Sequence, residues 1–159
     1  MKRKKAEAVG ADIRLYGKDI LRSASMRENK NITQHGKVSL FHHSLRVAYW
    51  SLLLAERLNV SVDKRALVRG ALLHDYYLYD WHVKDPDHRF HGFTHARRAE
   101  SFAHRDFSLT HKERDIIRKH MFPLNITPPK YKESLLVCVA DKISAVQETL
   151  QKKKRRKKD

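Results

Sequence analysis

Ionisable side chains stand at the ends or on the apolar faces of several predicted helices, where burial is costly. The clearest case is His74-Asp75, which directly follows the apolar run "ALVRGALL" at residues 66–73. An isolated carboxylate is expensive to bury unless it is paired or coordinates a metal ion. The pattern therefore indicates either a metal centre or a buried network of hydrogen bonds.

The same arrangement recurs on other segments of the chain. His43 heads an apolar helical face and His42 a mixed one, so we predict that His43 points inward. The other ionisable residues that share a face with apolar neighbours are His95, His120 and Asp141. Imidazole and carboxylate groups are common ligands of divalent transition metals. This set favours a metal centre, and a buried His–Asp network without metal stays open as the alternative.

These residues need a scaffold of helices to bring them together. Apolar residues recur at helical spacing, no alternating strand pattern is visible, and there are only 5 Gly and 4 Pro. We predict an all-α, single-domain bundle of about six helices. Ser61 is the expected cap of the third helix, and Thr110 with Glu113 the expected capping box of the fifth. The predicted helices span about 6–27, 39–59, 61–77, 94–105, 111–120 and 131–151, with a loop over 80–93.

The length of 159 residues fits one domain. We divide it into a basic N-terminal helix and linker packing on the core (1–34), a core domain (35–151) and a basic tail (152–159). The net charge is +16, of which residues 2–5 supply +4 and the tail +6. The moderately basic remainder suits an anionic substrate. We expect a disordered, solvated tail, with weak contact to nucleic acid or anionic lipid as its alternative role.

The single cysteine, Cys138, excludes an intramolecular disulfide and is interpreted as a core residue. The sequence shows no signal peptide and no apolar run long enough to cross a membrane. We therefore expect a cytoplasmic protein without a membrane span. The sequence makes no prediction of its oligomeric state.

Five short motifs resemble the HD superfamily of metal-dependent phosphohydrolases. They are "HSLRVA" (43–48), "LLHD" (72–75), "HARRA" (95–99), "IIRKH" (116–120) and "ADK" (140–142). The motifs fall in the order of that family and cover roughly residues 35–150. Their layout is similar to that of bacterial symmetrical dinucleoside tetraphosphate hydrolases, and we expect a bacterial subfamily. The Gly-Tyr-Pro signature of the cyclic-dinucleotide phosphodiesterase branch is absent.

The resemblance implies a centre that holds two divalent transition-metal ions, with iron, manganese and zinc all fitting the ligands. It implies hydrolysis of a phosphoester or phosphoanhydride bond in a nucleotide-like substrate by a metal-bridging hydroxide, with Asp75 bridging the two ions. The implied ligands are His43, His74, Asp75 and Asp141 for the first ion, and Asp75, His95 and His120 for the second.

Further residues are candidates for catalysis or for binding the substrate phosphates. Lys142, beside Asp141, is the candidate that the resemblance supports for both roles. His91 lies four residues before His95 and is a candidate for orienting a ligand or donating to a phosphate. The predicted catalytic residues are His74, Asp75, His91 and Lys142, and the predicted substrate-binding residues are His35, Arg97, Arg98 and Lys142.

The chain also departs from the family pattern. Where many HD enzymes have "HDxGK", this sequence has "HDYYLYDWH", which removes one phosphate-binding lysine and leaves Asp80 and His82 without a role. Two other functions stay open. One is a di-iron oxygenase, which some members of the superfamily are, and the other is a non-catalytic module that binds RNA through the basic ends. The presence of every ligand position argues against the second.

Overall fold

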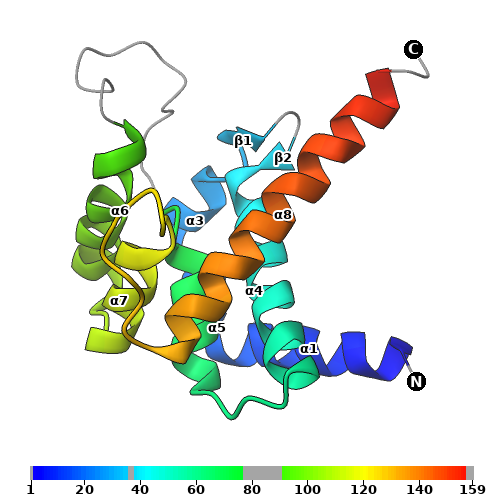
Figure 1. Ribbon diagram of the computed structural model, residues 1–159, viewed down its shortest axis with the longest axis horizontal. Helices are drawn as coiled ribbons and strands as arrows, with labels where there is room; N and C mark the ends of the chain where they lie inside the picture. The colour runs from blue at the N-terminus through cyan, green and yellow to red at the C-terminus, as the bar shows by residue number, and fades with distance from the viewer. Residues whose placement is uncertain (1, 36–37, 77–90, 157–159) are drawn as a thin grey trace.

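The computed structural model is all-α, as predicted, apart from one short β-hairpin (Figure 1). It describes residues 2–35, 38–76 and 91–156, without the side chains of 2–3, 33–35, 91–94 and 152–156. Within this part of the chain the elements are α1 (Lys2–Tyr16), α2 (Lys18–Arg22), α3 (Ala24–Glu28), β1 (Thr33–His35), β2 (Val38–Ser39), α4 (Leu40–Arg57), α5 (Lys64–Leu73), α6 (His91–Phe107), α7 (His111–Lys119) and α8 (Lys132–Arg156).

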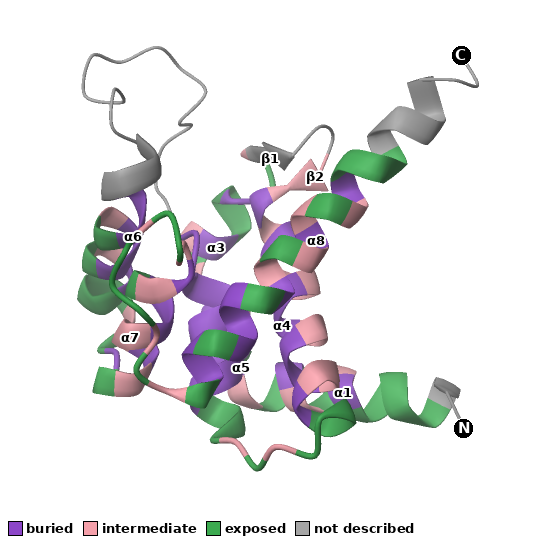
Figure 2. Ribbon diagram, in the orientation of Figure 1, coloured by how far each residue is buried: buried purple, intermediate pink, exposed green. Residues whose placement is uncertain are grey.

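The core lies where α5 is surrounded by α4, α7 and α8, and the most extensive packing is that of α4 against α8 and against α5. Figure 2 shows buried residues concentrated on α5 and the neighbouring part of α4, whereas exposed residues are frequent along α1. The N-terminal helices cover one side of the core, because α1 packs against both α4 and α5. The apolar residues at the centre include Leu67, Leu72, Leu73, Ile116, Ile117 and Val137, and those that the N-terminal helices add include Ile13, Ile20 and Met26.

The prediction of one continuous helix over about 6–27 is wrong, because this segment forms three helices, α1, α2 and α3. At Gly17 a Cβ atom would lie only 2.4 Å from Leu72 Cδ1, so this position must be glycine for the chain to approach α5. Ser23 adopts extended backbone angles, and its hydroxyl accepts a hydrogen bond from Met26 N as the N-cap of α3. A helix must end before such a cap.

The predicted cap of the third helix is also wrong. Asp63, not Ser61, is the N-cap of α5, and its carboxylate accepts a hydrogen bond of 3.0 Å from Ala66 N. The capping box of Thr110 and Glu113 at the start of α7 is confirmed. The two strands of the hairpin are antiparallel and were not expected, because strands of three and two residues are too short to show alternation.

Two other boundaries move outward. Residues 91–93, predicted as the end of a loop, form the first turn of α6, and the remaining loop residues lie outside the described part of the chain. The predicted sixth helix ends near residue 151, whereas α8 continues to Arg156. Among the described helices, none combines the length and the apolar character needed to cross a membrane.

A buried ion pair connects the N-terminal segment, α5 and α7. Arg69 is 3% exposed, and its Nε donates to Glu113 Oε1 at 2.8 Å. Its Nη1 lies 2.6 Å from both carboxylate oxygens of Asp19, and its Nη2 donates to the carbonyl of Phe107. Beside this pair, a Cβ at Gly70 would lie 2.6 Å from a side-chain carbon of Ile116, so α5 and α7 are in close contact. α5 and α7 end directly before His74 and His120, two of the predicted metal ligands.

Candidate metal centre

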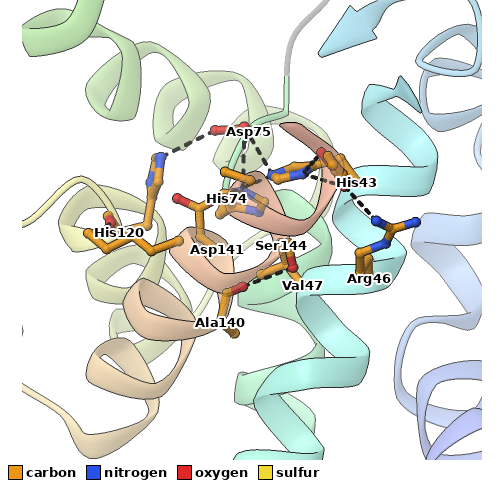
Figure 3. Close-up of polar contacts among 12 residues, drawn as sticks. His43, Arg46, Val47, His74, Asp75, His120, Ala140, Asp141 and Ser144 are labelled. Carbon is orange, nitrogen blue, oxygen red and sulfur yellow. Dashed lines mark hydrogen bonds and ion pairs between the residues drawn. The ribbon is translucent and has the colours of Figure 1, made fainter. Parts of the chain in front are cut away.

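The six residues predicted as metal ligands lie together, and Figure 3 shows five of them, His43, His74, Asp75, His120 and Asp141. Three groups of three bring ligand atoms within 4.8 Å of one another, and together these groups contain all six residues. The six residues come from five different parts of the bundle. His43 lies on α4, His74 and Asp75 follow α5, His95 lies on α6, His120 follows α7, and Asp141 lies on α8.

His74 and His120 occupy equivalent positions, each as the C-cap residue of its helix. His74 Nδ1 lies 2.8 Å from the carbonyl of Ala71, and His120 Nδ1 lies 2.7 Å from the carbonyl of Ile117. A carbonyl can only accept, so Nδ1 carries a proton in both rings and Nε2 faces the cluster. Among the described residues, neither of these buried Nε2 atoms has a hydrogen-bond partner. Buried polar atoms of this kind are rare in proteins and fit the role of metal ligands.

His43 is held by a carboxylate that the sequence analysis missed. Its Nδ1 lies 3.1 and 3.2 Å from the two oxygens of Glu148, whose side chain is fully buried. Nδ1 therefore donates to Glu148, and Nε2 faces Asp141 Oδ1 at 3.1 Å. Arg46 Nη1, at 3.6 Å, balances the charge of Glu148. Carboxylates that hold the far nitrogen of a histidine commonly orient metal ligands and raise their basicity.

A weak signal for Glu148 was present in the sequence. Glu148 lies seven residues, or about two helical turns, after Asp141 and therefore on the same face of the helix. Ser144 lies between them on that face and is also buried. A glutamate in line with a predicted ligand was the observation that could have identified it.

The two oxygens of Asp75 face different pairs of histidines. Oδ1 lies 2.6 Å from His95 Nε2 and 3.2 Å from His120 Nε2. Oδ2 lies 3.4 Å from His74 Nε2 and 3.9 Å from His43 Nε2. The carboxylate thus stands between two groups of candidate ligands. The first group is His43 and His74, with Asp141 beside them. The second group is His95 and His120.

The spacing of the donors fits divalent ions. Two ligands that are each about 2.1 Å from a tetrahedral ion are about 3.4 Å from each other. The first group contains separations of this size, with His74 Nε2 3.4 Å from Asp75 and 3.7 Å from Asp141 Oδ1. In the second group the contact of Asp75 with His120 also fits, whereas its contact with His95 is a direct hydrogen bond. The all-nitrogen-and-oxygen donor set suits iron, manganese and zinc without separating them.

The electrostatics of the cluster show how it is balanced without an ion. Burial opposes ionisation of Asp75, but the charges of His74 and His95 together with hydrogen bonds from His120 and His74 outweigh it and hold the pKa of Asp75 well below its usual value. Burial also lowers the pKa of His43, but the hydrogen bonds with Asp141 and Glu148 outweigh it and raise that pKa to about 9. Protonated imidazole thus neutralises the carboxylates, and a metal ion must displace such protons to bind.

Lys142 lies at the edge of the cluster. Its Nζ is 3.3 Å from the carbonyl oxygens of His120 and Cys138 and 3.1 Å from Cys138 Sγ. The ammonium therefore holds the main chain of a candidate ligand. Cys138 is 3% exposed, which confirms its interpretation as a core residue, and its thiol donates to the carbonyl of Phe122.

The two arginines predicted to bind phosphate lie on α6, shortly after the candidate ligand His95. Arg97 is exposed on α6 and lines a surface pocket together with Lys119, and Arg98 is half-buried. His42 is exposed and His43 fully buried, as the helical faces predicted. The residues whose side chains lie outside the described part of the chain are His35, Asp80, His82 and His91.

Comparison with known proteins gives one finding. The family model of the HD domain matches residues 40–146, a span that contains the six candidate ligands and Lys142 but not Glu148. No curated protein and no solved structure matches the chain.

Proposed function

The chain belongs to the HD-domain family, and from this premise we propose that it is a phosphohydrolase that depends on two divalent ions. Members of the family are generally metal-dependent phosphohydrolases. The proposed reaction is hydrolysis of a phosphoester or phosphoanhydride bond in a nucleotide-like substrate. The ions proposed are iron, manganese or zinc.

The main support for two ions is the position of the Asp75 carboxylate, whose oxygens face separate pairs of histidines at 2.6–3.9 Å. A carboxylate in this position can contribute one oxygen to each of two ions. When bound, the ions would lower the pKa of a water molecule and neutralise charge that develops on the phosphoryl oxygens.

The protein's own groups prepare the centre. The carbonyls of Ala71 and Ile117 fix the rings of two ligands so that Nε2 points inward, and Glu148 does the same for His43. These hydrogen bonds hold the three rings with Nε2 turned toward the other candidate ligands, the orientation in which they would coordinate an ion. We further propose that Lys142 holds the main chain of His120 and adds positive charge where a phosphate approaches.

The first experiment measures metal content per chain on protein purified anaerobically without chelator or added metal. About two ions per chain are expected from the donor set, and Asp75→Ala should lose both. Asp12→Ala, which removes a carboxylate of α1 paired with Lys64 outside the cluster, is the matched control and should keep them. Circular dichroism establishes that each variant is folded.

The second experiment measures phosphate release from nucleotides by protein reconstituted with manganese in the absence of oxygen. A hydrolase retains activity under these conditions, whereas a di-iron oxygenase does not. Folded protein that takes up no metal on reconstitution would overturn the proposal. Metal-loaded protein that consumes oxygen but releases no phosphate would replace it with the oxygenase.

A further inference from the structure

The outward face of α8 carries large apolar side chains. Four of them are between 40% and 58% exposed, namely Leu135, Val139, Val146 and Leu150. Their spacing of four, seven and four residues corresponds to whole turns, so they share one side of the helix over about 22 Å. We call this row the outward stripe. A surface helix normally turns its apolar side chains to the core, so a second apolar face indicates contact with another component.

The outward stripe is not needed to hold α8 on the rest of the protein. The inward face of α8 packs against α4, α5 and α7 and buries Val137, Ala140 and Ser144. Figure 1 shows α8 crossing α4 and extending beyond it toward the C-terminus. The outward stripe thus lies along an exposed helix, where an extended surface can contact several turns at once.

Positive charge accompanies the outward stripe. Lys132 is exposed at the start of α8, and the basic tail begins at residue 152 with "KKKRRKK", whose first five residues belong to α8. The carboxylates of α8 lie elsewhere, because Glu133 and Glu148 are buried and Asp141 belongs to the cluster of candidate ligands. A component that covers this face is therefore expected to be both apolar and anionic.

Two kinds of component meet these requirements only in part. Nucleic acid would pair with the basic residues but would leave the outward stripe without an apolar partner. A second copy of the chain would supply apolar side chains, but each copy has a net charge of +16 and would present the same basic helix. The surface of an anionic bilayer supplies acyl chains for the aliphatic side chains and phosphate head groups for the lysines and arginines.

We propose that the outward stripe and the basic tail bind the surface of a membrane that contains anionic phospholipid. In this assignment α8 lies in the plane of the interface, with its aliphatic side chains among the acyl chains and its basic residues at the head groups. Stable attachment to a membrane surface generally takes two signals, one of which can be a polybasic segment. α8 and the basic tail supply both signals. The inference does not depend on the metal centre or on the proposed reaction.

The test is sedimentation of the full-length protein with vesicles of phosphatidylcholine, either alone or mixed with phosphatidylglycerol. The wild type should bind the mixed vesicles, and less tightly as salt is raised. Val146→Gln combined with Leu150→Gln should weaken this binding about tenfold, because two half-exposed aliphatic side chains lose their contact with the acyl chains. Leu58→Gln is the matched control, since Leu58 is 62% exposed at the C-cap of α4, outside the stripe. It should stay within about twofold of the wild type.

A second variant tests the basic tail. Lys152→Gln, Lys153→Gln and Lys154→Gln together should weaken binding to the mixed vesicles about 100-fold, since each basic residue near an anionic surface contributes about fivefold. This variant should also reduce the dependence of binding on salt. Circular dichroism establishes that every variant is folded.

Four results would overturn the proposal. The first is wild-type protein that does not bind the mixed vesicles, and if it binds single-stranded RNA instead, the basic tail serves RNA. The second is an unchanged affinity of the stripe variant beside a loss in the tail variant, which would mean adsorption by charge alone. The third is an equal loss in Leu58→Gln. The fourth is a wild-type dimer in analytical ultracentrifugation that the stripe variant dissociates, which would assign this face to a second copy of the chain.

Discussion

Replacement of Glu148 should weaken metal binding although Glu148 touches no metal. Its two oxygens hold His43 Nδ1 at 3.1 and 3.2 Å, and Arg46 lies 3.6 Å away. Loss of a group that orients a ligand typically costs about 10–100-fold in metal affinity. Glu148→Gln keeps an acceptor oxygen and loses only the charge, so about tenfold is expected. Glu148→Ala leaves His43 without this acceptor as well, so about 100-fold is expected.

The affinity for zinc is measured by competition with a fluorescent chelator at two pH values. The pKa of His43 is about 9 in the metal-free protein, so near neutral pH a proton competes with the ion for this ring. Removing Glu148 lowers the pKa of His43, so the proton competes less well with zinc, but it also makes His43 a weaker ligand. Near neutral pH these two effects on the zinc affinity partly cancel. The full loss is therefore expected above pH 9 and a smaller one near pH 7.

The matched control is Glu133→Gln, which alters another buried glutamate of α8. Glu133 accepts a hydrogen bond from Asp63 N at 2.8 Å and lies in no group of candidate ligands. It should change zinc affinity by less than about twofold. Equal affinity of wild type and Glu148→Ala above pH 9 would refute the reasoning. So would an equal loss in Glu133→Gln, since the effect would then come from helix packing.

Three further predictions concern stability. In chelator-stripped protein the free energy of unfolding should fall by on the order of 3 kcal/mol between pH 6.5 and 9, because the pKa of His43 is raised from its usual 6.5 to about 9 on folding. This stabilisation is full below pH 6.5 and is lost as the pH rises through 9. Urea denaturation across this range measures it, and a flat profile would contradict it. Arg69→Ala should lower the free energy of unfolding by about 3 kcal/mol, because Glu113 would stay buried without its closest partner, and urea denaturation should detect this. Gly70→Ala should destabilise the fold by about 1–3 kcal/mol because of overpacking against Ile116, although alanine is the better helix former. A Tm equal to or above that of wild type would show that the two helices can move apart.

The helices and the inward-facing ligands could be predicted because both are properties of local sequence. Apolar spacing separates buried His43 from exposed His42 within one helix, and it identifies the face of Asp141. The resemblance of the ordered motifs to the HD superfamily then implies which ligands belong together. This reasoning needs no knowledge of distant contacts, and it located the main part of the candidate site.

The features that were missed depend on contacts between distant parts of the chain. Gly17, where the N-terminal helix is interrupted, packs closely against Leu72 of α5, and the choice of Asp63 as a cap is supported by Glu133 of α8, which accepts from its backbone N–H. Glu148 contacts a histidine 105 residues earlier in the chain. The division of the Asp75 oxygens between two pairs of histidines likewise depends on how four helices meet, and helical periodicity does not contain that information.

The distance along the chain between the ligands also sets the order in which the centre can form during synthesis. Asp75, His95 and His120 are all made before α8 begins, whereas the first group requires Asp141, which contacts His43 across 98 residues. Closing so long a loop is entropically costly, so this contact forms late unless the packing of α8 on α4 supports it. A nascent chain that has not reached α8 lacks Asp141 and also Glu148, the carboxylate that orients His43. In the proposed centre, complete loading with metal would therefore follow the docking of α8, and bound ions would mark chains in which α8 is in place.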